Sequence, residues 1–295
     1  MSVVFISGEF GSGTTLLFTL FRKTSDFHCL YEPLRQRLPY DLFWPTPVYE
    51  HHFFVDDYLT EYKGFRDLIK LFRTEWATSR LHLEPEDAAD DLHRYLSYLI
   101  GMSFVRAPNV ALKDNLLTFR LGWLRARFPD ARILHVYRDP ERQWNSLVRR
   151  SQRYVGREDI GQEKPDYGGF SLAAMCEDLA PSYPELEVNN FHSGYERFLK
   201  LMELSRKQHE RHAHVSVDYD ELRSDFDAAC ERMSAGLGVR LDAAQLRPYV
   251  VENPEVAKPL GATFHGSRAR LARLVDRGGR RYAEMRVRWA ARDGG

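Results

Sequence analysis

Apolar residues gather in five short runs along the chain, each bounded by turn-forming or charged residues. The middle of each run is uncharged, which is typical of strands that are buried on both faces of a parallel sheet. The runs occupy residues 3–7, 28–31, 110–113, 132–137 and 214–219. They predict the strands of one mostly parallel sheet.

Longer stretches between these runs space their apolar residues three and four apart, as amphipathic helices do. Helices are predicted over residues 14–23, 65–76, 90–104, 120–128 and 141–154. Strands that alternate with helices favour an α/β fold of three layers, in which a central, mostly parallel sheet of about five strands is flanked by helices. Irregular structure is predicted for residues 156–194 and 252–267.

Length and composition indicate an ordinary globular protein. The chain has 295 residues, of which 43% are hydrophobic and 28% charged, and this length is sufficient for a substantial core. We expect a single domain over residues 1–295, with helical insertions at about 55–105 and 155–212. The 42 basic and 42 acidic residues balance, which argues against wholesale binding of nucleic acid or membrane.

The cysteines and the N-terminus suggest a cytoplasmic protein. Cys29, Cys176 and Cys230 are odd in number and widely spaced, so they predict neither a disulfide framework nor a metal site. The first residues lack the basic start of a secretory signal, and no apolar run approaches the length of a membrane span. We expect no metal and no stable membrane insertion.

The stretch FISGEFGSGTTLL (5–17) leads from the first predicted strand through a glycine-rich turn into a helix. Its glycines allow the backbone to aim several N–H groups at one anion, and the helix N-terminus adds partial positive charge. Thr14 and Thr15 add hydroxyl donors. The lysine that nucleoside triphosphatases place after the last glycine is missing, so the loop suits a single phosphate. A glycine turn without a ligand is the alternative.

A second candidate anion site follows the fourth predicted strand. Arg138 ends this strand, Pro140 marks a helix start, and Ser146 lies within the helix, one turn after Arg142. A planar guanidinium and a hydroxyl that converge on one anion match a second phosphate. Alternatively, Arg138 is a surface ion-pair partner.

Three further residues stand at predicted strand ends. Glu32 directly follows the second predicted strand, and Lys113 is the last residue of the third. Both are therefore expected at the same edge of the sheet as the glycine loop. There they could act as base and charge stabiliser, or simply form a structural ion pair. Tyr219 could stack on a nucleobase, or belong to the core or rim.

Taken together, these residues resemble the sulfotransferase superfamily, which transfers a sulfuryl group from 3′-phosphoadenosine 5′-phosphosulfate (PAPS) to an acceptor. The segment FGSGTT is similar to that family's P-[KR]-S-G-T-T loop. Arg138 and Ser146 have the spacing of the family's strand-end arginine and the serine eight residues later. The segment YDEL, which begins at Tyr219, is similar to the family's Y-E-D-L segment. The resemblance implies a P-loop-like fold. It also implies that the 5′-phosphosulfate is held by Gly11, Ser12, Gly13, Thr14 and Thr15.

The same resemblance implies roles for the catalytic residues. The family's loop carries Lys or Arg where this chain has Gly11, and Lys113 is the natural substitute, because LKD matches the strand-end lysine that contacts the transferred group. Cytosolic-type members place a histidine base where Asn115 stands. The chain therefore resembles more closely the tyrosylprotein and carbohydrate branches, in which a glutamate after the second strand is the base. Glu32 fits this role.

The loop after Glu32 and the glycine loop each contain further ionisable residues. His51 and His52, in the loop after Glu32, are alternative bases. Glu9, inside the glycine loop, is unfavourable beside phosphates, and we expect it to point to solvent.

The expected activity is transfer of a sulfuryl group from PAPS to a hydroxyl of a carbohydrate, natural product, lipid or tyrosyl peptide, with adenosine 3′,5′-bisphosphate (PAP) as product. The aromatic segment 38–54 is expected to wall the acceptor pocket. A small-molecule kinase with a P-loop and a non-catalytic nucleotide-binding homologue are the alternatives. The acceptor and the oligomeric state are not encoded in any motif.

Overall fold

The five apolar runs form one parallel sheet in the computed structural model, which describes residues 1–43, 57–154 and 171–251, without the side chains of 149–154 and 251. The strands are β1 (Ser2–Ser7), β2 (Phe27–Tyr31), β3 (Asn109–Lys113), β4 (Arg132–Tyr137) and β5 (Val215–Asp218). Their order in the sheet is β2-β3-β1-β4-β5, and each neighbouring pair is parallel. This confirms the predicted α/β fold with a parallel sheet.

Helices connect the strands in the described parts of the chain. Between β1 and β3 these are α1 (Thr14–Arg22), α2 (Leu38–Phe43), η1 (Tyr58–Tyr62), α3 (Leu68–Leu71), α4 (Glu75–Thr78) and α5 (Asp90–Phe104). Between β3 and β5 they are η2 (Thr118–Arg120), α6 (Leu121–Arg127), α7 (Pro140–Tyr154), α8 (Leu172–Leu179), η3 (Pro184–Leu186), η4 (Val188–Asn190) and α9 (Gly194–His212). After β5 follow α10 (Tyr219–Ser224), α11 (Phe226–Leu237) and α12 (Ala243–Val251).

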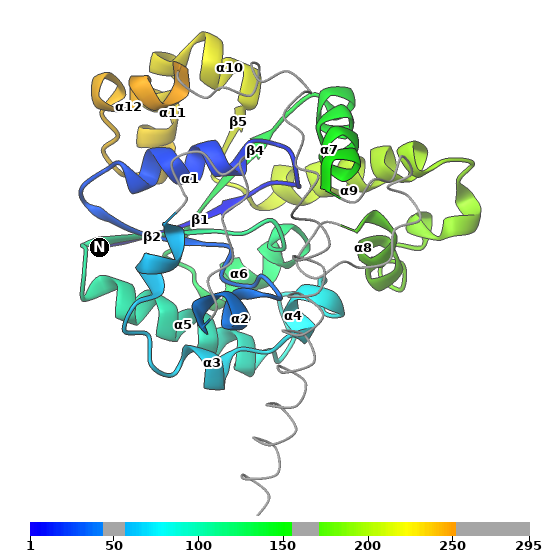
Figure 1. The fold of residues 1–295 in the computed structure, drawn as a ribbon, viewed down its shortest axis with the longest axis horizontal. Helices are drawn as coiled ribbons and strands as arrows, with labels where there is room; N and C mark the ends of the chain where they lie inside the picture. The colour runs from blue at the N-terminus through cyan, green and yellow to red at the C-terminus, as the bar shows by residue number, and fades with distance from the viewer. Residues whose placement is uncertain (44–56, 155–170, 252–295) are drawn as a thin grey trace, which may run out of the picture. The chain divides into compact units, whose positions relative to one another are not determined.

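Two apolar layers cover the two faces of the sheet because successive side chains of a strand point to opposite sides. Val4 and Ile6 of β1 pack with α1, α11 and α12, whereas Phe5 packs with α3, α5 and α6. Figure 1 shows these two sets of helices on opposite sides of the sheet. A third cluster joins α8 and α9 to α7. The sheet thus lies at the centre of three layers.

Side chains that accept from backbone N–H groups fix several helix starts. Ser171, Ser193, Asp218 and Asp225 cap α8, α9, α10 and α11 in this way. Such a cap typically stabilises a helix by about 1 kcal/mol. The cap at Asp218 matters most here, because it starts α10 directly at the end of β5 and so fixes Tyr219 at the edge of the sheet.

The helix predicted over 65–76 is wrong in its middle. Phe72 has an extended backbone (φ −64°, ψ 141°) and ends α3. The guanidinium of Arg73 then donates to the carbonyls of Lys70 and Phe72, which takes the place of a further helical turn. The chain restarts as α4 only two residues later.

The prediction of irregular structure over 156–194 is also wrong in part. Leu172, Met175, Cys176 and Leu179 share one face of α8 and are buried. These four residues have helical spacing. The prediction was wrong because the glycines and prolines near them indicated irregular structure. Residues 155–170 and 252–267 lie outside the described residues.

All the described residues belong to one compact unit, Met1–Asn253. The single domain expected over residues 1–295 stays a prediction.

Candidate active site

The carboxyl ends of the strands bring the predicted residues to one edge of the sheet. Lys113 of β3 is in register with Ile6 of β1 on one side and with Tyr31 of β2 on the other. Glu32 therefore emerges next to Lys113, and the glycine loop begins two residues after Ile6. Parallel pairing alone creates this meeting of distant segments.

Two glycines of the loop adopt conformations that other residues avoid. Gly11 has φ 84° and Gly13 has φ 108°. A Cβ atom on Gly13 would come within 2.1 Å of Cδ2 of Tyr219, far inside van der Waals contact. The loop therefore packs directly on the Tyr219 ring, and only glycine permits that approach.

Ser12 gives the loop an unsatisfied polar group. Its side chain is 1% exposed, and its Oγ meets no hydrogen-bond partner among the described residues. A buried hydroxyl without a partner costs about 1–3 kcal/mol. A phosphate oxygen at the N-terminus of α1 would satisfy it, so the residues present fit an anion.

The two threonines at the start of α1 connect the loop to the neighbouring strands. Oγ1 of Thr14 donates to Oδ1 of Asn115 at 2.9 Å, and Oγ1 of Thr15 hydrogen-bonds the hydroxyl of Tyr31 at 3.2 Å. Asn115 stands where some relatives are expected to have a histidine base. Here its side-chain oxygen instead anchors the loop.

Glu32 and Lys113 form a close ion pair at the centre of this edge. Nζ of Lys113 lies 2.5 Å from Oε1 of Glu32, with side-chain exposures of 1% and 16%. The ammonium also lies 4.5 Å from the centre of the Tyr31 ring. A carboxylate that can take a proton and a cation shielded from water thus lie beside Tyr31, whose hydroxyl bonds Thr15 of the loop.

The backbone of Glu32 is strained. Among the described residues it is the one non-glycine residue with positive φ, at 48°. The left-handed conformation costs such a residue roughly 1–2 kcal/mol. Strain of this kind persists only where the surroundings enforce it.

Arg138 and Tyr219 meet on the other side of β1. Cζ of Arg138 lies 4.6 Å from the centre of the Tyr219 ring, and Tyr219 is only 2% exposed. A contact chain therefore runs from Gly13 through Tyr219 to Arg138. Ser146 is half-buried in the second turn of α7. The binding of a second phosphate by Arg138 and Ser146 and the contact of Tyr219 with adenine stay predictions.

Arg142, one turn before Ser146, pairs with another part of the chain. Its guanidinium lies 2.7 Å from Oδ2 of Asp220 at the start of α10, and both side chains are exposed. This pair joins α7 to α10, so it connects the elements that carry Ser146 and Tyr219.

Glu9 does not point to solvent, and that expectation is wrong. The residue is 4% exposed, and its carboxyl oxygens meet no hydrogen-bond partner among the described residues. Burial raises the pKa of Glu9 from 4.5 to about 7, although the nearby hydroxyls of Thr118 and Ser205 oppose the rise. The protonated form of Glu9, which predominates below about pH 7, avoids the conflict with a phosphate that motivated the expectation.

Sequence reasoning missed Arg35, which lies three residues after Glu32. Its guanidinium pairs with the buried carboxylate of Asp41 and lies 5.3 Å from the centre of the Tyr58 ring. Burial alone would lower its pKa, but Tyr58, Asp41 and Glu32 raise it above the ordinary value. The arginine thus adds permanent positive charge near Glu32. Its closeness to Glu32 in the sequence was the available signal.

Sequence reasoning also missed Gln143, which is 2% exposed on α7. Its Nε2 donates to the backbone oxygen of Phe10 at 2.8 Å, so α7 holds the glycine loop through its main chain. Nothing in the residue types distinguishes such an amide from an ordinary surface glutamine.

His51 and His52 lie outside the described residues, as does most of the segment 38–54. Residues 38–43 of that segment form α2. The proposed wall of the acceptor pocket and the alternative bases stay predictions.

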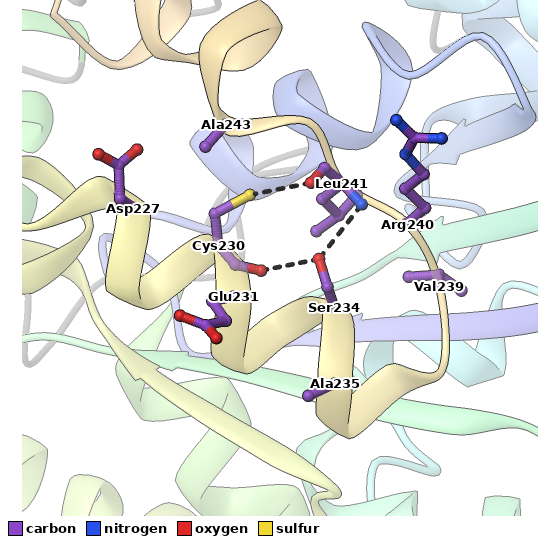
Figure 2. Close-up of a pocket in the computed structure, with 9 residues that line it drawn as sticks. All are labelled: Asp227, Cys230, Glu231, Ser234, Ala235, Val239, Arg240, Leu241 and Ala243. Atoms are coloured by element: carbon purple, nitrogen blue, oxygen red, sulfur yellow. Dashed lines mark hydrogen bonds between the residues drawn. The ribbon is translucent and has the colours of Figure 1, made fainter.

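A hollow of about 530 Å³ lies elsewhere on the described surface, along α11 and its connection to α12. Figure 2 shows Cys230, Ser234 and Leu241 among the residues that line it, joined to one another by hydrogen bonds. None of the predicted site residues lines this hollow. The chemistry of the strand ends is therefore separate from it.

Within the described ranges, no helix is long and apolar enough to span a membrane. The same residues contain no group of three or more His, Cys, Asp or Glu side chains that could hold a metal ion.

A parallel sheet whose first strand leads through a glycine-rich turn into a helix N-terminus defines a P-loop-like α/β protein. The model of the sulfotransferase family matches residues 3–243. The chain belongs to this family, and its activity class is that of a sulfuryl transferase.

Two solved structures are similar to this chain. A sulfotransferase, STF9, from Mycobacterium avium shares 16% identity, with coverage of 88% of this chain and 70% of that protein and a TM-score of 0.46. A sulfotransferase from Alicyclobacillus acidocaldarius shares 19% identity, with coverage of 86% and 92% and a TM-score of 0.40. A comparison with curated proteins gave no match.

Proposed function

We propose that this protein transfers a sulfuryl group from PAPS to an acceptor hydroxyl, with Glu32 as the general base and Lys113 as the charge stabiliser. The observation that carries the proposal is their 2.5 Å contact beside the glycine loop. Family membership supports the reaction class. The donor and the roles of the residues are our inference.

The 5′-phosphate of the donor is assigned to the loop from Gly11 to Thr15. Its support is the hydroxyl of Ser12, which has no hydrogen-bond partner among the residues that the structure describes, together with the backbone N–H groups and the helix N-terminus behind it. We assign the 3′-phosphate to Arg138 and Ser146 and the adenine to the neighbourhood of Tyr219, as the resemblance implies.

When bound, PAPS supplies a sulfuryl group whose bond to the bridging phosphate oxygen breaks as the acceptor oxygen bonds to sulfur. Glu32 takes the proton of the acceptor hydroxyl. Lys113 is shielded from bulk water, so its charge is well suited to oppose the negative charge that develops on the leaving side. Thr14 and Thr15 hold the loop in place relative to β2 and β3 through Asn115 and Tyr31.

Replacing Glu32 by Gln tests the role of the base. The amide keeps the shape but cannot accept the proton, so turnover should fall by roughly 10²–10⁴-fold while PAPS affinity stays nearly unchanged. Glu61→Gln is the matched control, because Glu61 is also a half-buried glutamate paired with a cation. Its partner is Arg22, the last residue of α1, at the opposite end of that helix from the glycine loop. A Glu32→Gln enzyme with near-normal turnover on its true acceptor would refute the role.

Replacing Lys113 by Ala separates the cation from the base. Turnover should fall, and PAPS should also bind more weakly, because the ammonium is expected to contact the transferred group. Sulfate transfer and calorimetric binding, measured on the same preparations, distinguish the two variants. PAP binding without transfer to any acceptor would favour a non-catalytic homologue, and Mg²⁺-dependent ATP turnover would favour a kinase.

The acceptor class we propose remains broad: a hydroxyl of a carbohydrate, natural product, lipid or tyrosyl peptide. A transfer screen across these four classes, with the wild-type protein and Glu32→Gln in parallel, identifies the acceptor and excludes background transfer.

A further inference from the structure

The strained conformation of Glu32 is held by bonds to the main chain around it. The N–H of Glu32 itself donates to the carbonyl of Lys113 at 2.6 Å, and its carbonyl accepts from the N–H of Arg35 at 3.0 Å. The first bond joins the end of β2 to β3, and the second closes a turn after Glu32. Further bonds come from side chains that are distant in the sequence.

Two buried tyrosines bind the carbonyls on either side of Glu32. The hydroxyl of Tyr62 donates to the carbonyl of Tyr31 at 2.9 Å, and the hydroxyl of Tyr95 donates to the carbonyl of Pro33 at 2.7 Å. Tyr62 is 3% exposed and Tyr95 is fully buried. Phenylalanine would fill the same apolar space, so the hydroxyls are the part of these side chains that acts on this segment.

Asp114 binds the segment from the opposite strand. Its Oδ2 accepts from the N–H of Leu34 at 2.7 Å, and its Oδ1 accepts from the N–H of Leu116 at 2.9 Å. The carboxyl is 1% exposed. Burial raises its pKa to about 6, and the negative charge of Glu32 contributes to the rise. Asp114 therefore lies close enough to Glu32 to sense its charge.

We propose that Asp114, Tyr62 and Tyr95 form a clamp that positions Glu32, by fixing the main chain of residues 31–34 so that the left-handed Glu32 keeps its carboxylate on Lys113. The inference rests on the proposed function of Glu32 as the base. The clamp residues are positioning residues, because each one bonds the main chain of the segment and none touches the reacting atoms.

The arrangement differs from ordinary core packing in its target. Three buried polar side chains, from η1, from α5 and from the end of β3, all end on the same four residues. Burying a polar group is unfavourable unless it is bonded. Together, these bonds fix the main chain around Glu32, the one non-glycine residue with positive φ among the described residues.

The test is a double-mutant cycle that combines Tyr95→Phe with Glu32→Gln. Tyr95→Phe alone should lower kcat about tenfold or more and leave PAP affinity unchanged, because only the position of the base is altered. In the Glu32→Gln background the same change should have almost no effect, since no base is left to position. Asp114→Asn should behave in the same way. Tyr95→Phe preserves the test if Asp114→Asn does not fold.

Ser103→Ala is the matched control on the same helix. The hydroxyl of Ser103 bonds Nδ1 of His28 on β2 at 2.9 Å and is equally buried, but it does not contact residues 31–34. It should lower stability as Tyr95→Phe does and leave kcat unchanged. If the control lowers kcat to the same extent, the loss reflects the fold in general and the clamp is refuted.

A crystal structure of Tyr95→Phe gives a readout that does not depend on activity. The distance between Nζ of Lys113 and Oε1 of Glu32, 2.5 Å in the present structure, should lengthen. An unchanged distance overturns the clamp whatever the turnover. The clamp is also overturned if Tyr95→Phe lowers kcat by the same factor in the Glu32→Gln background as in the wild-type protein. Normal turnover of Glu32→Gln alone refutes the proposed base, and with it the purpose of the clamp, so the two failures can be told apart.

Discussion

Replacing the buried Glu9 by Gln should make the protein more stable at high pH. The carboxyl is 4% exposed and has no hydrogen-bond partner among the described residues. Gln has the same shape but cannot ionise, so the substitution removes the need to bury a negative charge and leaves the packing in place.

The size of this gain in stability follows from the difference between the pKa of Glu9 in the folded and in the unfolded state. The pKa of Glu9 is about 7 in the folded protein, against an ordinary value of 4.5, and each unit between them corresponds to about 1.4 kcal/mol. Below a pH of about 4.5, Glu9 is protonated in both the folded and the unfolded state, so it causes no loss of stability. As the pH rises towards the folded value the unfolded state ionises first, so stability falls, by about 3 kcal/mol in total. Most of this loss, about 2 kcal/mol, falls between about pH 5.5 and about pH 8.

Urea unfolding of both proteins across this pH range measures the effect. The difference in the free energy of unfolding should grow in favour of Glu9→Gln by about 2 kcal/mol from the lower to the higher pH. His135 and His209, whose pKa values are lowered by burial, and Asp114 also make stability depend on pH. They are present in both proteins and cancel in the difference.

The exposed Glu86→Gln controls for the amide substitution itself. If the curves of the wild-type protein and Glu9→Gln run parallel over the whole range, the carboxyl of Glu9 is charged and compensated in the folded state. The reasoning from its burial would then be refuted.

Two further substitutions test the nucleotide side of the site. Arg138→Ala should weaken PAP binding at least tenfold, since a charged contact to phosphate is worth about 1.5–3 kcal/mol, and unchanged affinity by calorimetry would contradict the assignment. Gly13→Ala should destabilise the protein by about 3 kcal/mol, because a Cβ atom would come within 2.1 Å of the Tyr219 ring at a φ that alanine avoids. Gly101→Ala, where a Cβ atom meets nothing within 4 Å, is its control in urea unfolding and should not destabilise.

The sequence predicted the sheet and the strand-end residues well, for a physical reason. Strands buried on both faces are short uncharged runs, and the carboxyl ends of parallel strands must meet at one edge. The pairing of Glu32 with Lys113 is a consequence of that rule. The glycine loop could be recognised because Gly11 and Gly13 occupy backbone conformations that exclude other residues.

What the sequence did not reveal depends on contacts between distant segments. Glu9 is buried by the fold, and the hydroxyls that act on its pKa belong to Thr118 and Ser205, more than one hundred residues away in the chain. The break between α3 and α4 is a different case, because it depends on local capping by Arg73 in an otherwise helical pattern. The clamp on Glu32 uses tyrosines that look, in the sequence alone, like ordinary core residues.

The strand order β2-β3-β1-β4-β5 has a consequence for how such a chain can diverge. β2, which leads to Glu32, and β3, which ends at Lys113, lie on one side of β1, whereas β4 and β5, which lead to Arg138 and Tyr219, lie on the other. Under the proposed assignment, the base lies on the β2 side of the sheet, and the groups assigned to the 3′-phosphate and the adenine lie on the β4 and β5 side. Substitutions in the residues that follow Glu32 can therefore alter the surroundings of the acceptor hydroxyl without changing the groups assigned to the 3′-phosphate and the adenine.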